Sequence, residues 1–290
     1  MKEVVYIANA LKRYPLVYHP LIINLKVNGI EVEILDTLNI WTRDYMPIQT
    51  RNGFVKFQYK TLKYEQYSQL RIDFESPYWV SVLKKFNSLK YSNIILDGGN
   101  CQMDFDKEIA IITDIVFEMN PEYKEEELVT ELSRLLEAKV IVIPREPEDE
   151  LGHADGIVKF ISRYFVLLNE YKKEKIMFAY EEKVKKILVS NGLKVIGFPN
   201  FYTMRPRITE DEFRKKYVDA DDFNPSWGYA INFLKIDRLA VVPVFNIKQD
   251  KEIIDTVRKY CPDCSVVAID CSELSMEGGL INCVTRDYTM

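Results

Sequence analysis

The feature that most constrains the fold is a fivefold alternation of helix-like and strand-like segments. In five places, a segment compatible with a helix is followed by a short strand rich in β-branched residues and then by a polar loop. Alternating helices and strands predict an α/β fold, and about five similar units favour radial repetition over one open doubly wound sheet. The five expected strands span residues 31–35, 93–96, 139–143, 193–198 and 265–269.

Local signals place the helices that precede these strands. Ser76 followed by Pro77 is a good N-cap and first-turn pair, and leucines between 128 and 136 recur at helical spacing. We expect two further helices at 181–190 and near 250–260. Other strand-like stretches lie at 53–59, 108–115, 156–161, 164–169, 229–234 and 239–245.

The composition is that of an acidic globular protein. Of the 290 residues, 47% are hydrophobic and 29% charged, and the net charge is −5. This charge argues against nucleic-acid binding, which requires a basic surface, and mildly favours a cationic ligand. No apolar run approaches the roughly 20 residues of a membrane helix, and no signal peptide is evident. We expect a cytoplasmic protein without a membrane partner, forming a single domain over 1–290 because no linker interrupts the chain.

Cysteine and histidine usage limits metal and redox chemistry. The five cysteines are few and odd in number, which indicates a reducing compartment and free thiols. The only histidines, His19 and His153, leave no basis for a His-rich metal centre, so we expect no metal. The pair Cys261 and Cys264 has the CxxC spacing of a redox or half-zinc motif. Without a second such pair, and with Pro262 where a helix ends, an incidental turn is the favoured interpretation.

Polar residues that could perform chemistry gather in loops after the strands. Taken singly, each loop has an ordinary explanation, such as a buried ion pair, a turn or a buried thiol. Together, one cysteine, one histidine and several acids indicate a nucleophile, its acid–base partner and an anionic pocket suited to a guanidinium group. We expect His153 and Asp155 in an extended segment, with both side chains on one face. The loops span residues 41–44, 97–100, 152–156 and 278–283.

The chain is similar to the agmatine deiminase and Porphyromonas-type peptidyl-arginine deiminase family, within the guanidine-modifying superfamily. The resemblance implies a pentein fold, a five-bladed pseudo-symmetric α/β propeller with a central active site. It also implies that the partner is a small cationic guanidine and that no cofactor is needed. A homo-oligomer is compatible with it. The motifs that carry it, in the family's order, are WTRDYMP (41–47), DGGN (97–100), GHADG (152–156) and GGLINCVT (278–285).

The resemblance implies three catalytic residues. Cys283 corresponds to the thiol that attacks the guanidinium carbon, and His153 to the group that protonates departing ammonia and then activates water. Asp97 corresponds to the acid beside this histidine. The implied reaction converts agmatine to N-carbamoylputrescine and ammonia through a thiouronium bound to the cysteine.

The resemblance also implies which residues bind the substrate, and the chain differs from agmatine deiminases at two motif positions. Asp44 and Asp155 correspond to the acids that hold the guanidinium nitrogens, and Trp41 to a wall of the pocket. Agmatine deiminases commonly carry glutamate at the position of Asp97 and histidine at that of Asn282. The departures leave the reaction class intact and the far end of the substrate undecided.

Two alternatives stay open. An arginine or peptidyl-arginine deiminase with the same core would need a cation for its substrate's carboxylate, for which Arg51, Arg71 and Arg205 are candidates. The amine of agmatine would instead meet acidic or aromatic residues, such as those in 201–213 or the acidic cluster in 219–222, although a solvated acidic face is the simpler reading of both. The alternative of another class is a catalytically inert pentein that only binds a ligand.

Overall fold

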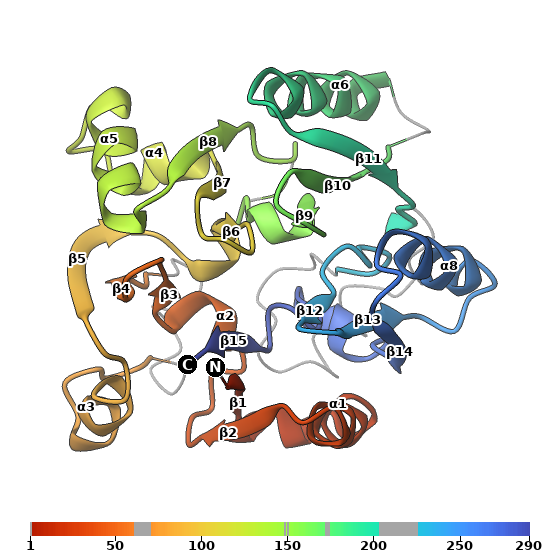
Figure 1. Cartoon of the computed structure of the whole chain (residues 1–290), viewed down its shortest axis with the longest axis horizontal. Helices are drawn as coiled ribbons and strands as arrows, with labels where there is room; N and C mark the ends of the chain where they lie inside the picture. The colour runs from red at the N-terminus through yellow and green to blue at the C-terminus, as the bar shows by residue number, and fades with distance from the viewer. Residues whose placement is uncertain (1, 61–70, 148, 150, 172–174, 203–225) are drawn as a thin grey trace, which may run out of the picture. The chain divides into compact units, whose positions relative to one another are not determined.

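A computed structural model describes residues 2–60, 71–147, 149, 151–171, 175–202 and 226–290 (Figure 1). The chain divides into two compact units. The terminal unit comprises Met1–Thr42 and Gly197–Met290, and the internal unit comprises Arg43–Ile196. The described residues form five three-stranded sheets accompanied by helices, which confirms the expected mixed α/β class.

Two of the sheets belong to the terminal unit. One has the strand order β15-β1-β2 and the other β12-β13-β14. The elements of this unit, in chain order, are β1 (Glu3–Ala8), the 3₁₀ helix η1 (Asn9–Arg13), α1 (Pro15–Val27), β2 (Glu31–Leu35), β12 (Leu234–Ile236), β13 (Leu239–Val244), α8 (Asp250–Tyr260), β14 (Ser265–Asp270), the 3₁₀ helix η7 (Leu274–Glu277) and β15 (Arg286–Thr289).

The other sheets, with orders β3-β4-β5, β6-β7-β8 and β11-β10-β9, belong to the internal unit, except for the last residues of β11. The elements here are α2 (Thr42–Tyr45), β3 (Ile48–Gln49), β4 (Phe54–Gln58), α3 (Pro77–Leu83), β5 (Leu89–Ile95), η4 (Gly98–Asn100), β6 (Gln102–Met103), β7 (Ile109–Thr113), α4 (Ile115–Met119), α5 (Glu125–Leu136), β8 (Lys139–Ile143), η5 (Ala154–Gly156), β9 (Val158–Phe160), β10 (Phe165–Asn169), α6 (Lys175–Ser190) and β11 (Lys194–Phe198).

The sheets share one connectivity. In four of them, the middle strand pairs antiparallel with one neighbour and parallel with the strand that follows it after a helix, as β13 does with β12 and β14. In the fifth, β10 lies between β9 and β11, and α6 connects β10 to β11. The repeated helix-to-strand pattern of the sequence therefore corresponds to a repeated three-stranded unit.

Helix α5, which lies between β7 and β8 in the chain, is amphipathic, and its apolar stripe supplies part of the core. In α5, Leu128, Leu132, Leu135 and Leu136 are buried and pack with β7 and β8 residues in one cluster. Burying each leucine stabilises the fold by about 1.5–3 kcal/mol relative to exposure. Acidic residues fill the first turn of α5, where they complement the helix dipole, and Glu137 ends the helix in a left-handed conformation.

The structure corrects three of the expected boundaries. The helix expected at 181–190 begins at residue 175, and the strand expected at 93–96 spans Leu89–Ile95. Residues 229–232 form a turn in which the Asn232 N–H donates to the Tyr229 carbonyl, and only Leu234–Ile236 is a strand. The last error arose because Ala230, Ile231 and Phe233, in and just after this turn, are all buried and so resemble a buried strand in the sequence.

The lengths and polarity of the helices can be compared with what a membrane span requires. In the part of the chain that is described, every helix is too short or too polar to cross a bilayer.

Candidate active site

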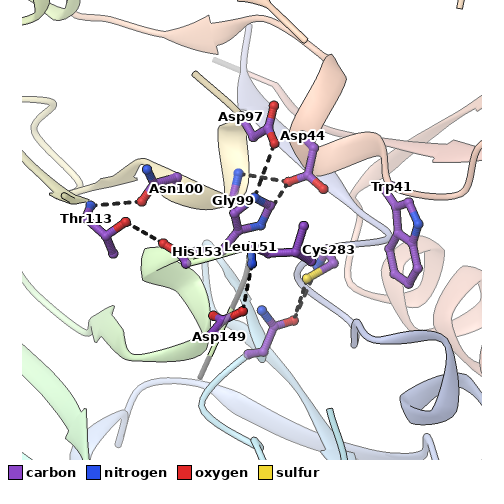
Figure 2. Close-up of polar contacts among 12 residues, drawn as sticks. Trp41, Asp44, Asp97, Gly99, Asn100, Thr113, Asp149, Leu151, His153 and Cys283 are labelled. Atoms are coloured by element: carbon purple, nitrogen blue, oxygen red, sulfur yellow. Dashed lines mark hydrogen bonds and ion pairs between the residues drawn. The ribbon is translucent and has the colours of Figure 1, made fainter. Parts of the chain in front are cut away.

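In the internal unit, a histidine lies between two carboxylates. His153 Nε2 is 3.3 Å from Asp97 Oδ2, and His153 Nδ1 is 3.7 Å from Asp44 Oδ1 (Figure 2). Asp44 belongs to α2, Asp97 lies two residues after β5 and immediately precedes η4, and His153 immediately precedes η5. Three segments far apart in the sequence therefore bring one base and two acids together, as the motifs predicted.

Gly99 completes this cluster through its backbone. Its N–H donates a hydrogen bond to Asp44 Oδ1 at 3.0 Å. A Cβ atom at this position would lie 2.6 Å from Asp44 Oδ1 and 2.6 Å from His153 Nδ1, closer than real Cβ contacts. The second glycine of DGGN is thus required by the close approach of an acid and an imidazole, not only by a turn.

The charges of the cluster shift the pKa values of its members. Burial raises the pKa of Asp44 to about 7; His153 opposes this shift, and Asp97 and Asp155 add to it. Burial works against the charged form of His153, but the charges of Asp44, Asp97 and Asp155 outweigh it and raise the pKa of His153 to about 10. Near neutral pH the histidine is therefore a cation inside a cluster of acids.

The backbone around Asp155 differs from the expected extended segment. His153 has an extended backbone, but Asp155 lies within the 3₁₀ turn η5, so the prediction of a continuous strand was wrong. Gly152, with φ of 60°, introduces the turn, and the N–H of Ile157 closes it on the carbonyl of Ala154 at 3.0 Å. The buried Asp155 still acts electrostatically on His153, because a tight turn keeps the two residues close.

Thr113 connects the two loops that carry Asp97 and His153. Its backbone N–H donates to Asn100 Oδ1 at 2.9 Å, and its hydroxyl donates to the carbonyl of Gly152 (Figure 2). Thr113 and Asn100 are both buried. Sequence reasoning did not single out Thr113, and its position at the end of the EIAIIT strand, beside a polar loop, was the available signal.

Cys283 lies in the terminal unit, where Asn232 fixes its position. The backbone N–H of Cys283 is 3.3 Å from Asn232 Oδ1, and Cys283 Sγ is 3.4 Å from the same oxygen. The N–H of Asn282 also donates to the backbone carbonyl of Asn232 at 3.1 Å. Because a backbone N–H can only donate, the amide oxygen must face Cys283, and the thiol therefore donates to it.

Asn232 was not among the predicted site residues. A lone amide within the apolar segment YAINFL, in a stretch that resembles the family, was the signal that could have identified it.

Trp41 packs against the glycine pair that precedes Cys283, also within the terminal unit. A Cβ atom on Gly279 would lie 2.2 Å from Trp41 Cζ3, so the indole occupies the space that a side chain would need. The backbone N–H of Trp41 donates to Asn39 Oδ1 at 3.0 Å, and this bond fixes the backbone that carries the indole. The first and last motifs are thereby in contact.

The predicted site residues thus fall into two groups. Asp44, Asp97, Asp155 and His153 belong to the internal unit, and Trp41 and Cys283 belong to the terminal unit. The described residues contain no group of three or more His, Cys, Asp or Glu side chains suited to a metal ion.

The structure gives little support to the arginines considered as partners of a substrate carboxylate. Arg51 is 3.9 Å from Glu108, and Arg71 is exposed. Arg205 and the acidic cluster at 219–222 lie outside the described residues.

Comparison with known proteins identifies the family. The model of the Porphyromonas-type peptidyl-arginine deiminase domain matches residues 3–288. The chain belongs to this family. Curated relatives include the putative agmatine deiminases of Latilactobacillus sakei, 20% identical over 226 residues, and of Lactococcus lactis, 21% identical over 225 residues. These matches cover 68% and 71% of this chain but 58% and 60% of the relatives, so less than two thirds of their length is matched.

Solved structures share the fold at low identity. An agmatine deiminase of C. jejuni superposes with a TM-score of 0.73 and 16% identity, covering 99% of this chain and 93% of that one. The agmatine deiminase of Enterococcus faecalis has a TM-score of 0.75 and 17% identity, with the same coverage. A more distant neighbour, named DDAH, from Pseudomonas aeruginosa has a TM-score of 0.59 and 11% identity over 99% of this chain and 100% of that one.

Proposed function

We propose that this protein is a guanidine iminohydrolase that converts agmatine to N-carbamoylputrescine and ammonia. The observation that carries the proposal is the placement of His153 between Asp44 and Asp97, in a chain that also keeps the family's cysteine motif. The curated relatives are named putative agmatine deiminases, which supports agmatine as the substrate.

The acids form a receptor for a planar cation. A guanidinium group presents a fork of N–H donors, and carboxylates accept such a fork in pairs. We assign this role to Asp44 and Asp155, with the indole of Trp41 as a wall of the pocket. Since burial raises the pKa of Asp44 to about 7, an arriving cation favours the charged carboxylate and is held by it in return.

In the proposed reaction, the thiolate of Cys283 attacks the guanidinium carbon and forms a C–S bond. His153, which is protonated at neutral pH, gives its proton to the departing nitrogen, the C–N bond breaks, and ammonia leaves. The neutral imidazole then takes one proton from water as the water attacks the thiouronium. Cleavage of the C–S bond restores the thiolate, and the remaining hydroxyl proton passes to solvent as the ureido carbonyl forms. Asp97 orients the imidazole. Such acid–base catalysis contributes about 10²–10⁴-fold to the rate.

We further propose that residues 1–290 form one catalytic domain in which the five sheets are the blades of a pseudo-symmetric propeller. The repeated connectivity of the sheets and the family membership support this arrangement. The proposed reaction uses both Cys283 and His153, as the family's motifs imply. The partner is a small cationic guanidine, and homo-oligomers are compatible with the proposal.

A reducing, cytoplasmic location agrees with the absence of disulfides among the five cysteines, all of which lie in the described residues, and the chemistry requires no cofactor.

The test is a screen for ureido product with agmatine, free arginine, methylarginines and short arginine peptides. We expect turnover of agmatine by the wild type and none by Cys283→Ala. Cys101→Ala, which removes another buried thiol in a separate core cluster, is the control that should keep activity. Turnover of arginine or its peptides without agmatine would favour the peptidyl-arginine deiminase alternative that the family's name suggests. Activity in Cys283→Ala, or none with any guanidine, would refute the proposal.

A further inference from the structure

Outside the proposed active site, a tight turn in the terminal unit brings two cysteines together. Cys261 caps the C-terminus of α8, and the N–H of Cys264 donates to the carbonyl of Cys261 at 3.0 Å. Such a turn holds its first and fourth Cα atoms within about 7 Å, and a disulfide needs about 4.4–6.8 Å. Pro262, in the second position, restricts the backbone φ and favours this turn before any bond forms between the sulfur atoms.

The two thiols differ in exposure and in acidity. Cys261 is buried, whereas Cys264 is partly exposed, and their side chains are hydrogen-bonded to each other. This hydrogen bond lowers the pKa of Cys264 to about 7; Lys235 assists, while burial, Asp263 and Asp237 oppose the shift. One accessible sulfur is therefore ready to react as a thiolate, and a second, shielded sulfur lies beside it.

Strand β14 separates this pair from the next cysteine in the chain. The strand begins directly after Cys264, and its six residues extend over about 20 Å before Cys271 follows. Cys271 is fully buried, and burial raises its pKa well above the ordinary value. The pair at the end of α8 thus has a reactivity that Cys271 does not share.

We propose that Cys261 and Cys264 form a dithiol–disulfide site that reacts with low-molecular-weight disulfides. The thiolate of Cys264 attacks one sulfur of the reagent, forms a mixed disulfide and releases the first reagent thiol. Cys261 then loses its proton and attacks the sulfur of Cys264, which releases the second reagent thiol and closes the protein disulfide. The protein gives up two electrons and two protons, and the reagent takes them up as two thiols. The site does not depend on the proposed deiminase activity.

Oxidised glutathione is the probe for this site, and peptide mapping gives the readout. The reduced protein is incubated with the probe at neutral pH, free thiols are blocked, and the chain is cleaved on the amino side of aspartate without reduction. Cleavage at Asp255, Asp263 and Asp270 places Cys261 in fragment 255–262 and Cys264 in fragment 263–269. We expect the two fragments to remain joined by a disulfide in the wild type, at a yield independent of protein concentration.

Single substitutions test the order of attack. Cys261→Ser, or Cys261→Ala if the serine is not tolerated in the buried position, should accumulate one glutathione on fragment 263–269. Cys264→Ser should leave fragment 255–262 unmodified over the same period. A pKa of about 7 raises the thiolate fraction about 15-fold over an ordinary thiol, and the lower intrinsic nucleophilicity reduces the gain to about threefold in rate. We expect this threefold advantage over an unstructured peptide with the same four residues.

Three results would overturn the proposal. In the first, the wild-type protein keeps glutathione stably on Cys264 and gives no joined fragments. In the second, the wild-type protein does not react at either cysteine. In the third, the Cys264→Ser variant reacts at Cys261 as fast as the wild type reacts at Cys264. A fourth result that would overturn the proposal is a yield of joined fragments that rises with protein concentration, because this would indicate disulfides between molecules.

Discussion

Replacing Gly99 with alanine is the sharpest test of the geometry around His153. The added methyl group would lie 2.6 Å from both Asp44 Oδ1 and His153 Nδ1, whereas ordinary contact begins at 3.4 Å. Each neighbour would have to retreat by 3.4 − 2.6 = 0.8 Å. If Asp44 retreats along the line of its hydrogen bond to the Gly99 N–H, the bond lengthens from 3.0 Å to about 3.8 Å and is lost.

The expected cost follows from the kind of hydrogen bond that is broken. A hydrogen bond to a charged group contributes about 1.5–3 kcal/mol, which corresponds to a loss of about 10- to 150-fold in kcat/KM. A displacement of about 1 Å in a catalytic group can by itself cost about 10²-fold. We therefore expect Gly99→Ala to lower kcat/KM by one to two orders of magnitude with whichever guanidine the wild type turns over.

Gly156→Ala is the matched control, because a Cβ atom there would meet no atom within 4 Å, although the residue adjoins Asp155. It should keep activity within about twofold of wild type. A readout without turnover is the histidine NMR titration, which only two histidines make simple to assign. In Gly99→Ala the pKa of His153 should fall from about 10, since Asp44 is farther away. Wild-type kcat/KM together with an unchanged His153 titration would refute the proposed contact.

Three further predictions concern pH, the indole and the thiol. Activity requires Asp44 to be deprotonated and His153 to be protonated, so kcat/KM should rise with pH through about 7 and fall through about 10. A pH profile without this rise and fall would contradict the roles proposed for Asp44 and His153. Gly279→Ala should displace Trp41, raise KM and cost about 1–3 kcal/mol of stability in a denaturant titration, and an unchanged KM would argue against the indole as a pocket wall. Asn232→Leu should lower kcat more than it raises KM, because it removes the acceptor that holds the backbone N–H of Cys283 in place; equal effects on both would indicate a merely structural role.

The sequence predicted those parts of the fold that local patterns determine. The expected strands at 31–35 and 139–143 and the helix near 250–260 agree with the structure, because spacing and flanking residues decide such segments. The pairing of β1 with β15 was not predicted, since nothing local connects strands with partners such as Glu3 and Thr289. Long-range pairing is a tertiary property, and short runs such as VVYIA and RDYT have many potential partners.

In the site, the sequence identified the residues of the cluster better than their backbone geometry. Asp97 and His153 were expected to be neighbours, and they are. The turn at Asp155 was missed because a strand and a tight turn can both hold the spacing His-x-Asp. Thr113 and Asn232 were missed for a different reason: each acts through a contact with a distant segment, and single residues in apolar stretches give no periodic signal.

The pairing of β1 with β15 also bears on how the protein is made. Their register joins residues such as Glu3 and Thr289, which are 286 positions apart and whose side chains are also hydrogen-bonded. During synthesis, the pairing of β1 with β15 must therefore wait until residues 286–289 have left the ribosome, and contacts this distant in sequence form slowly. The loop that holds Cys283 directly precedes β15, so we expect Cys283 to reach its final position only when β15 pairs with β1. A nascent chain, or one truncated before residue 286, would then carry a Cys283 thiol whose position is not yet fixed.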